Sequence, residues 1–158
     1  MKIYDCNYLE FGDILMSIRR KPIQHIEETF TMEVFDKPYT LSYDERPKYL
    51  YVRVKCAEFS TQIAVDYLQE VIGECRELKY SRVLIERDVP IMLMPAENKF
   101  VAEQISLTGV SGLKIAVVEP RADDRGLRTF SAAANRSVGI KVRAYDTVPR
   151  AKRWLLAD

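Results

Sequence analysis

The chain has 158 residues, a formal net charge of +1 and a hydrophobic fraction of 47%. This length is enough to bury a core without disulfides or metals, and the composition excludes an intrinsically disordered segment. A net charge near zero gives no general reason to expect a nucleic acid or an acidic membrane as partner. We therefore expect a single domain over residues 1–158 that binds no nucleic acid.

Cysteine usage and hydropathy indicate a reducing compartment. Cys6, Cys56 and Cys75 form an odd, widely spaced set without a Cys-x-x-Cys pair, which disfavours a disulfide framework or a zinc site. Residues 1–7 lack the apolar core of a signal peptide, and no apolar run approaches the roughly 18 residues of a membrane span. These features predict a cytoplasmic protein with no membrane span and no metal.

The first third of the chain contains the period of β-strands. Residues 1–28 show no regular pattern, but apolar and polar residues alternate in three later segments. These segments are Phe30 to Val34, Tyr39 to Tyr43 and Leu50 to Val54, with turns predicted at residues 36–38 and 44–48. The pattern indicates an antiparallel meander with one covered face and one wetter face. We expect residues 1–48 to be an N-terminal extension whose meander packs on the rest of the domain.

From Ser60 onward, helical and strand patterns alternate. Ser60 or Thr61 can cap a helix, and apolar residues then recur at helical spacing up to Leu78. Strands are predicted at Arg82 to Glu86, Leu113 to Glu119 and Ile140 to Tyr145, and further helices at residues 96–107, 124–137 and 149–156. This alternation predicts an α/β fold: a mixed sheet with a parallel centre, antiparallel N-terminal strands and about four helices.

Two apolar features predict how the core is built. The Ile-Ala-Val-Val centre of the segment Leu113 to Glu119 is apolar on both faces, which is typical of a central strand in a parallel sheet. Trp154 and Leu155 follow Ala151 at helical spacing, on a helix too short to be stable alone. We therefore expect Trp154 and Leu155 to be core residues that dock this helix onto the sheet.

Three segments of the C-terminal half resemble one known family. They are Leu113-Lys-Ile-Ala-Val-Val-Glu, Phe130-Ser-Ala-Ala-Ala-Asn-Arg-Ser-Val-Gly-Ile-Lys-Val-Arg-Ala-Tyr-Asp and Ala151-Lys-Arg-Trp154-Leu155. Together they form an apolar strand, a helix ending in Asn-Arg-x-x-Gly, a strand ending in Tyr-Asp and a last helix with Ala-x-x-Trp-Leu. This ensemble is similar to the STAS-like domain family, which includes the SpoIIAA-like proteins and is grouped with the CRAL-TRIO lipid-binding fold. The resemblance covers Tyr49 to Leu156.

The resemblance implies a non-enzymatic regulatory or interaction module that binds a protein partner. One alternative is a domain that binds a small apolar ligand or a lipid. Another alternative is a structural homo-oligomer, such as a homodimer, assembled through the aromatic residues of the meander. These are Tyr39, Tyr43, Tyr49 and Tyr51.

The chain departs from the family at its regulatory position. In the phosphoregulated anti-anti-sigma members, a Ser or Thr follows an Asp at the end of the third strand and opens the next helix. Asp88 is present here, but no hydroxyl residue occurs between Asp88 and Lys99. The phosphorylation switch, and sigma-factor control with it, is therefore not carried over to this chain.

Residues that carry most enzyme chemistry are few and isolated. His25 is the only histidine, so a catalytic triad or a histidine-rich metal site would need distant partners. Cys56 ends a predicted strand and Cys75 lies on an apolar helical face, where core packing is expected rather than nucleophilic attack. Because the sequence shows no cluster of polar residues suited to a pocket, we expect no enzymatic activity and no cofactor.

The segment from Val89 to Pro95 is an apolar, methionine-rich loop. Such loops adapt to varied partners, although a loop that folds back over the sheet as core has the same composition. Open α/β sheets bind ligands beside the carboxyl ends of their strands, and the amides of a helix N-terminus can receive an anion. We predict a recognition surface at this loop and the following helix, made of Asp88, Ile91, Met92, Met94, Asn98 and Lys99.

Basic residues are concentrated between residues 121 and 153. This stretch contains nine of them against three acidic residues. The basic residues are Arg121, Arg125, Arg128, Arg136, Lys141, Arg143, Arg150, Lys152 and Arg153, and the acidic ones are Asp123, Asp124 and Asp146. Solvated helix faces and a site for an anionic partner both fit this surplus.

Overall fold

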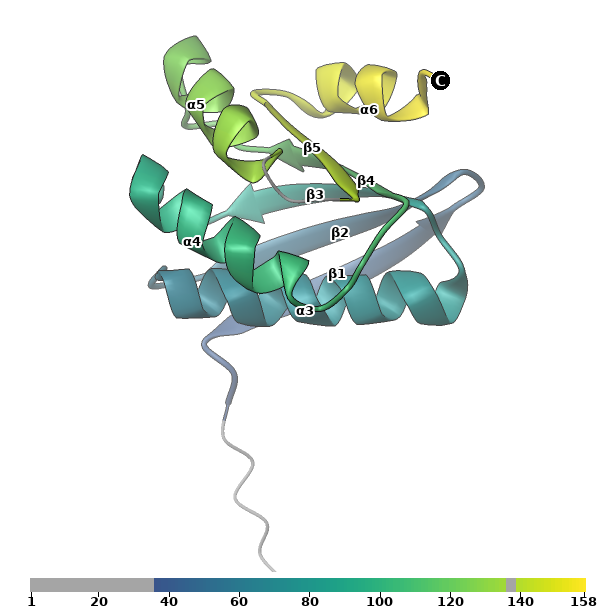
Figure 1. Ribbon diagram of the computed structural model, residues 1–158, viewed down its shortest axis with the longest axis horizontal. Coiled ribbons are helices and arrows are strands. Elements are labelled where there is room, and N and C mark those ends of the chain that lie inside the picture. The colour runs from purple at the N-terminus through teal and green to yellow at the C-terminus, as the bar shows by residue number, and fades with distance from the viewer. Residues whose placement is uncertain (1–35, 136–138) are drawn as a thin grey trace, which may run out of the picture. The chain divides into compact units, whose positions relative to one another are not determined.

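The computed structural model describes residues 36–135 and 139–158 (Figure 1). The chain divides into units of residues 1–36 and 37–158. Cys6, His25 and the strand predicted at residues 30–34 lie outside the described residues. Within the predicted N-terminal extension, residues 39–46 form a strand of the main sheet.

A five-stranded mixed sheet organises residues 37–158. Its strands are β1 (Tyr39–Arg46), β2 (Tyr49–Cys56), β3 (Arg82–Asp88), β4 (Leu113–Val118) and β5 (Ile140–Tyr145), in the spatial order β1-β2-β3-β4-β5. The pair β1–β2 is antiparallel, and the other three pairs are parallel. The prediction of a parallel centre with an antiparallel N-terminal part is confirmed.

The turn between β1 and β2 is shorter than predicted. Asp44, Glu45 and Arg46 pair in register with Tyr51, Leu50 and Tyr49, so only Pro47 and Lys48 form the turn. A turn is therefore confirmed within the predicted residues 44–48, but it begins three residues later than predicted. β1 lies at one end of the strand order, and a strand in this position tolerates polar side chains that face solvent. The polarity of residues 44–46 therefore did not indicate a turn.

Four helices lie within the described residues, as predicted: α3 (Thr61–Leu78), α4 (Pro95–Ser106), α5 (Asp124–Ala134) and α6 (Val148–Leu156). The helices α3, α4 and α5 pack into one apolar cluster with one face of the sheet. The opposite face forms a second cluster with α6, which lies across β3, β4 and β5 (Figure 1). Alternate residues of the strands divide between these two clusters, because side chains of a strand point to opposite faces.

Local signals set the limits of α3. The hydroxyl of Ser60 accepts a hydrogen bond from the Ile63 amide at 3.3 Å, which confirms the predicted cap. The helix ends at Lys79, which has a left-handed backbone with φ of 63° and closes the helix through its own N–H. Cys75 is buried on the apolar face of α3 as predicted, and burial raises the pKa of its thiol to about 11. Such a thiol carries little of the thiolate form that attacks electrophiles.

The outer edge of β5 is covered by polar side chains of α5 and of Asn135, the residue that follows this helix. The Asn135 side chain accepts from the Val142 amide at 2.9 Å and donates to the Val142 carbonyl at 2.5 Å. The Ser131 hydroxyl accepts from the Ala144 amide at 2.9 Å. These bonds occupy backbone groups of β5 that would otherwise be open to another strand. They also explain the asparagine in the Asn-Arg-x-x-Gly segment.

The contact of α6 with the sheet differs from the prediction at Trp154. Ala151 and Leu155 are fully buried, so the docking role of Leu155 is confirmed. Trp154 is only partly buried: its ring lies 6.1 Å from the Tyr145 ring and 4.7 Å from the Lys114 ammonium. Because Ala151 and Leu155 are one helical turn apart and face the sheet directly, the neighbouring Trp154 covers the margin of this contact.

Within the described ranges, no helix combines the length and the apolar composition that crossing a bilayer would require.

We predict that Leu155→Ala lowers the free energy of unfolding by about 2–5 kcal/mol, because it leaves a cavity under α6. Trp154→Ala is expected to cost less than Leu155→Ala, since the indole is partly exposed. Urea denaturation measures both values. Lys152→Ala, on the exposed side of the same helix, is the control and is expected to stay within about 0.5 kcal/mol of the wild type. Equal losses for Leu155→Ala and Lys152→Ala would contradict the docking role.

Candidate functional site

A buried ion pair joins the carboxyl ends of β3 and β4. The Nε and Nη2 atoms of Arg87 donate to Oε2 of Glu119 at 3.2 and 2.9 Å. Both side chains are 3% exposed. The guanidinium also lies over two aromatic rings, 5.0 Å from the centroid of Phe59 and 5.5 Å from that of Phe130. One charged pair thus connects two strands with the segment before α3 and with α5.

The second oxygen of this carboxylate has no hydrogen-bond partner among the described residues. Oε1 of Glu119 is buried, whereas the backbone N–H of Glu119 donates to the Tyr145 carbonyl at 2.8 Å. The guanidinium interacts electrostatically with the hydroxyl of the buried Tyr67. A buried charge of this kind is tolerated only when an opposite charge and hydrogen bonds compensate its loss of water. The Arg87–Glu119 pair lies under α3 and α5, and this position indicates a structural role.

The prediction from sequence missed this pair, although two signals were present. Arg87 occupies the same alternation as Val83 and Ile85, so its side chain follows the buried face of β3. Glu119 directly follows the buried run of β4. A charge in phase with a buried strand face is expected to find an opposite charge nearby.

The loop between β3 and α4 has two buried anchors and two exposed apolar tips. Val89 and Leu93 are buried in the core cluster on the α3–α5 side of the sheet. Ile91 and Met94 are 55% and 65% exposed. Met92 is partly buried, and its methyl group lies 3.6 Å from the position that a Cβ atom would take at Gly126. Core packing and a free apolar surface therefore both occur in this loop, at different residues.

Asp88 lies at the base of the same loop and is exposed. Its carboxylate is 3.8 Å from the Arg121 guanidinium, and both side chains are more than half exposed. Arg121 also donates to the Val89 carbonyl. An exposed pair at this distance contributes little stability by itself. The arginine instead ties the loop after β4 to the loop after β3.

Of the two polar residues of α4 predicted for the recognition surface, Lys99 is exposed but Asn98 is buried. Asn98 is 7% exposed and its side-chain amide donates to the Leu93 carbonyl at 3.1 Å, so its exposed recognition role is wrong. Lys99 is exposed and forms an ion pair with Glu103 at 3.1 Å. Polarity suggested exposure for both residues, but the amide of Asn98 is needed to satisfy a loop carbonyl.

The start of α4 does not favour an anion. The Glu97 carboxylate accepts from the Met94 amide at 2.9 Å and places a negative charge in the first turn. Pro95 occupies the first turn as well and has no N–H to offer. An anion at the predicted position would therefore be repelled by the Glu97 carboxylate, which already accepts from the Met94 amide.

A mainly apolar cavity under α4 and α5 has a volume of about 50 Å³. Its lining includes Leu93, Val101, Ile115 and Phe130, with Arg87 at its polar end. Pockets for small-molecule ligands usually have volumes of roughly 300–1,000 Å³. The cavity is therefore too small for a lipid chain.

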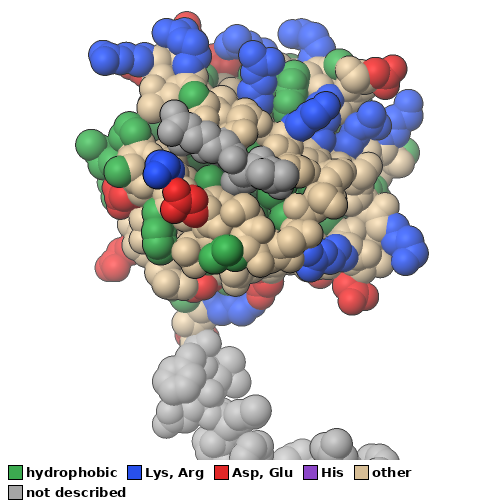
Figure 2. All heavy atoms as spheres, viewed as in Figure 1, with side chains coloured by type: hydrophobic (Ala, Val, Ile, Leu, Met, Phe, Trp, Pro, Cys, Tyr) green, Lys and Arg blue, Asp and Glu red, His purple; other side chains and the backbone are tan. Residues whose placement is uncertain are grey.

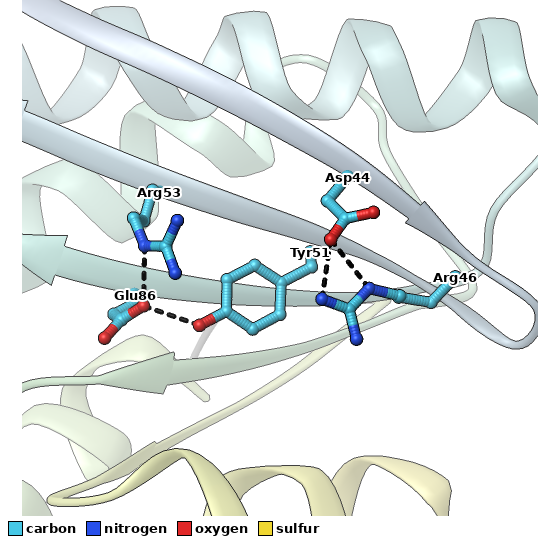
Figure 3. A network of polar contacts seen from close by, with 5 residues as sticks. All are labelled: Asp44, Arg46, Tyr51, Arg53 and Glu86. Carbon is cyan, nitrogen blue, oxygen red and sulfur yellow. Dashed lines mark hydrogen bonds and ion pairs between the residues drawn. The ribbon is translucent and has the colours of Figure 1, made fainter.

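A polar network covers part of the other sheet face, beside the region under α6 (Figure 3). The hydroxyl of Tyr51 donates to Oε1 of Glu86 at 2.5 Å, and Nε of Arg53 donates to the same oxygen at 3.1 Å. The guanidinium groups of Arg46 and Arg53 lie 5.2 and 5.4 Å from the Tyr51 ring centroid. Burial, followed by the hydrogen bond to Glu86, raises the pKa of the Tyr51 hydroxyl. The phenol is therefore neutral at physiological pH and acts as a hydrogen-bond donor.

The described residues contain no group of three or more His, Cys, Asp or Glu side chains that could hold a metal ion.

Comparison with solved structures finds a similarity to the crystal structure of an uncharacterised protein of the DUF3478 family from Shewanella loihica PV-4, which has a SpoIIAA-like fold. The match covers 79% of this chain and 99% of that chain, with 11% identity and a TM-score of 0.46. A match at this identity says nothing about a shared activity or partner. No protein-family model and no curated protein matches the chain.

We predict that the buried ion pair is strongly coupled. Glu119→Leu alone is expected to lower the free energy of unfolding by about 3–5 kcal/mol, because it leaves Arg87 buried without a counter-charge. The double variant Arg87→Met/Glu119→Leu is expected to recover most of this loss, since neither charge remains buried. Chemical denaturation of both single variants and the double variant gives the coupling energy.

The exposed pair next to it provides the control. Asp88→Asn removes the ion pair with Arg121 at the same end of the sheet and is expected to change stability by less than about 1 kcal/mol. Additive losses from the two single variants at Arg87 and Glu119 would show that the pair is not coupled.

Proposed function

We propose that this chain is a non-enzymatic interaction module that binds a protein partner through the loop after β3. The observation that carries the proposal is the exposure of Ile91 and Met94 on a loop whose neighbouring residues Val89 and Leu93 are anchored in the core. Ile91 and Met94 are thus exposed apolar side chains on a loop whose backbone is held by buried neighbours. An apolar centre of this kind, surrounded by polar residues, is typical of protein-binding surfaces.

The surroundings of the two tips supply the polar rim. Asp88 and Arg121 lie on one side as an exposed pair, and Lys99 pairs with Glu103 on α4. These charges balance one another, so the surface attracts neither a strongly acidic nor a strongly basic partner. The partner that fits is a protein segment with apolar side chains and few charges at its centre.

Two features support a protein partner over the alternatives. The cavity of about 50 Å³ offers little space for an apolar ligand or lipid. Of the aromatic residues considered for homo-oligomer contacts, Tyr39, Tyr49 and Tyr51 are buried, and Tyr43 is 37% exposed. They therefore leave a small aromatic surface for another copy of the chain.

Recognition by this loop does not depend on phosphorylation in the proposed mechanism. The segment from Asp88 to Lys99 contains no Ser, Thr or Tyr. Constitutive binding, set by the concentration of the two proteins, follows from such a surface.

We predict that Ile91→Asp and Met94→Asp abolish partner capture while leaving the melting temperature close to that of the wild type. Both side chains are exposed, so folding does not require desolvating the new charge, whereas an apolar contact does. The measurement is a pull-down from the native host followed by reconstitution with the purified captured protein. Thermal melting reports the fold of each variant.

Leu107→Asp is the matched control, because Leu107 is 79% exposed and lies just after the other end of α4. It is expected to keep binding. Met92→Asp is expected to reduce both stability and binding, since Met92 is partly buried beside Gly126. Unchanged binding in both tip variants would place the recognition surface elsewhere.

A further inference from the structure

The surface over α5, β5 and α6 is strongly basic. Figure 2 shows Lys and Arg side chains gathered along the top of the molecule, where Figure 1 places α5 and α6. The exposed basic residues of these elements are Arg125, Arg128, Lys141, Arg143, Arg150, Lys152 and Arg153. Positive charge is therefore concentrated on the surface of these three elements, although the net charge of the chain is only +1.

Three of these arginines line one hollow. Arg128 comes from α5, Arg143 from β5 and Arg150 from the first turn of α6. The hollow has a volume of about 460 Å³, and Asp124 is the acidic residue in its lining. It lies beside the carboxyl end of β5, the end of a parallel sheet where α/β proteins bind ligands.

Two of the three guanidinium groups are not neutralised. Arg150 forms an ion pair with Asp146 at 2.9 Å. Arg128 and Arg143 have no ion-pair partner among the described residues, and Arg143 interacts with the phenol of Tyr145. Asp124 and Asp146 offset only part of the positive charge at the hollow. The remaining positive charges repel each other, and a bound anion relieves that repulsion.

Hydrogen bonds of Ser131, a lining residue, connect two elements of the hollow. The Ser131 hydroxyl donates to the Leu127 carbonyl and accepts from the Ala144 amide, both at 2.9 Å, so it joins α5 to β5. The Tyr145 ring, also in the lining, lies 6.1 Å from the Trp154 ring and 6.0 Å from the Arg150 guanidinium. A ligand therefore meets preformed walls, which lowers the entropy cost of binding.

We propose that this hollow is a binding site for a small phosphorylated molecule. Guanidinium groups bind phosphate oxygens with paired hydrogen bonds, and arginines from three elements can surround one phosphate group. Leu127, Ala144 and Tyr145 supply apolar and aromatic surface for the organic part of the ligand. The volume of the hollow falls in the usual range of roughly 300–1,000 Å³ for small-molecule pockets.

The shape of the site favours a small molecule over nucleic acid. A nucleic acid is bound by basic residues that follow its backbone, often together with several aromatic platforms for the bases. Here the charges converge on one hollow with one aromatic side chain, Tyr145, in its lining. The hollow lies between α5 and β5 and does not include the loop residues Ile91 and Met94.

Isothermal titration calorimetry of the full chain at low ionic strength, with inorganic phosphate and pyrophosphate as probes, tests the proposal. Saturable binding at one site is expected, and it weakens with added salt. Arg128→Gln and Arg143→Gln are each expected to weaken pyrophosphate binding at least tenfold. Lys152→Gln removes the same charge from α6 outside the hollow and is expected to weaken it by less than twofold.

Two further measurements keep the outcome decisive. Amide chemical shifts of the wild-type protein are expected to change around residues 124–128 and 143–145 on adding pyrophosphate, which requires no variant to fold. A short DNA duplex is expected not to displace pyrophosphate. Absence of saturable binding, equal losses for Lys152→Gln and the two arginine variants, shifts confined to other regions, or displacement by the duplex would each overturn the proposal.

Discussion

The burial of one ion pair constrains the whole carboxyl end of the sheet. Arg87 and Glu119 lose nearly all contact with water, and this loss is compensated only while β3 and β4 hold the two side chains within hydrogen-bonding distance. The rings of Phe59 and Phe130 cover the guanidinium from the sides of α3 and α5. The relative positions of two strands and two helical segments are thus linked through a single charged group.

This constraint also positions the two proposed surfaces. The loop with Ile91 and Met94 begins one residue after β3, and Arg121, two residues after Glu119, bonds to its backbone. The helix α5 then separates the loop from the arginine hollow. Gly126 of α5 lies against Met92, whereas Arg128, half a turn further on, lines the hollow. The two surfaces therefore share one helix as a common wall.

The strands and helices were largely predictable because their signals are local. The limits of β5 follow from its alternation of apolar and basic residues, and the Ser60 side chain caps α3 as predicted. The site was less predictable, because its decisive contacts are long-range. Arg87 and Glu119 are 32 residues apart, and polarity alone gave no reason to bury Asn98. The polarity of a residue predicts its exposure poorly when its side chain supplies the hydrogen bond that a buried polar group requires.

The hydrogen bonds from Asn135 and Ser131 to β5 have a consequence for assembly. An open fibre that grows by joining sheet edges needs two available edges on every copy, one to accept a strand and one to offer it. In this fold the β5 edge is already bonded to side chains of its own chain. Growth through both edges would first require α5 to release β5, so this polar cover protects the sheet from unlimited edge-to-edge polymerisation.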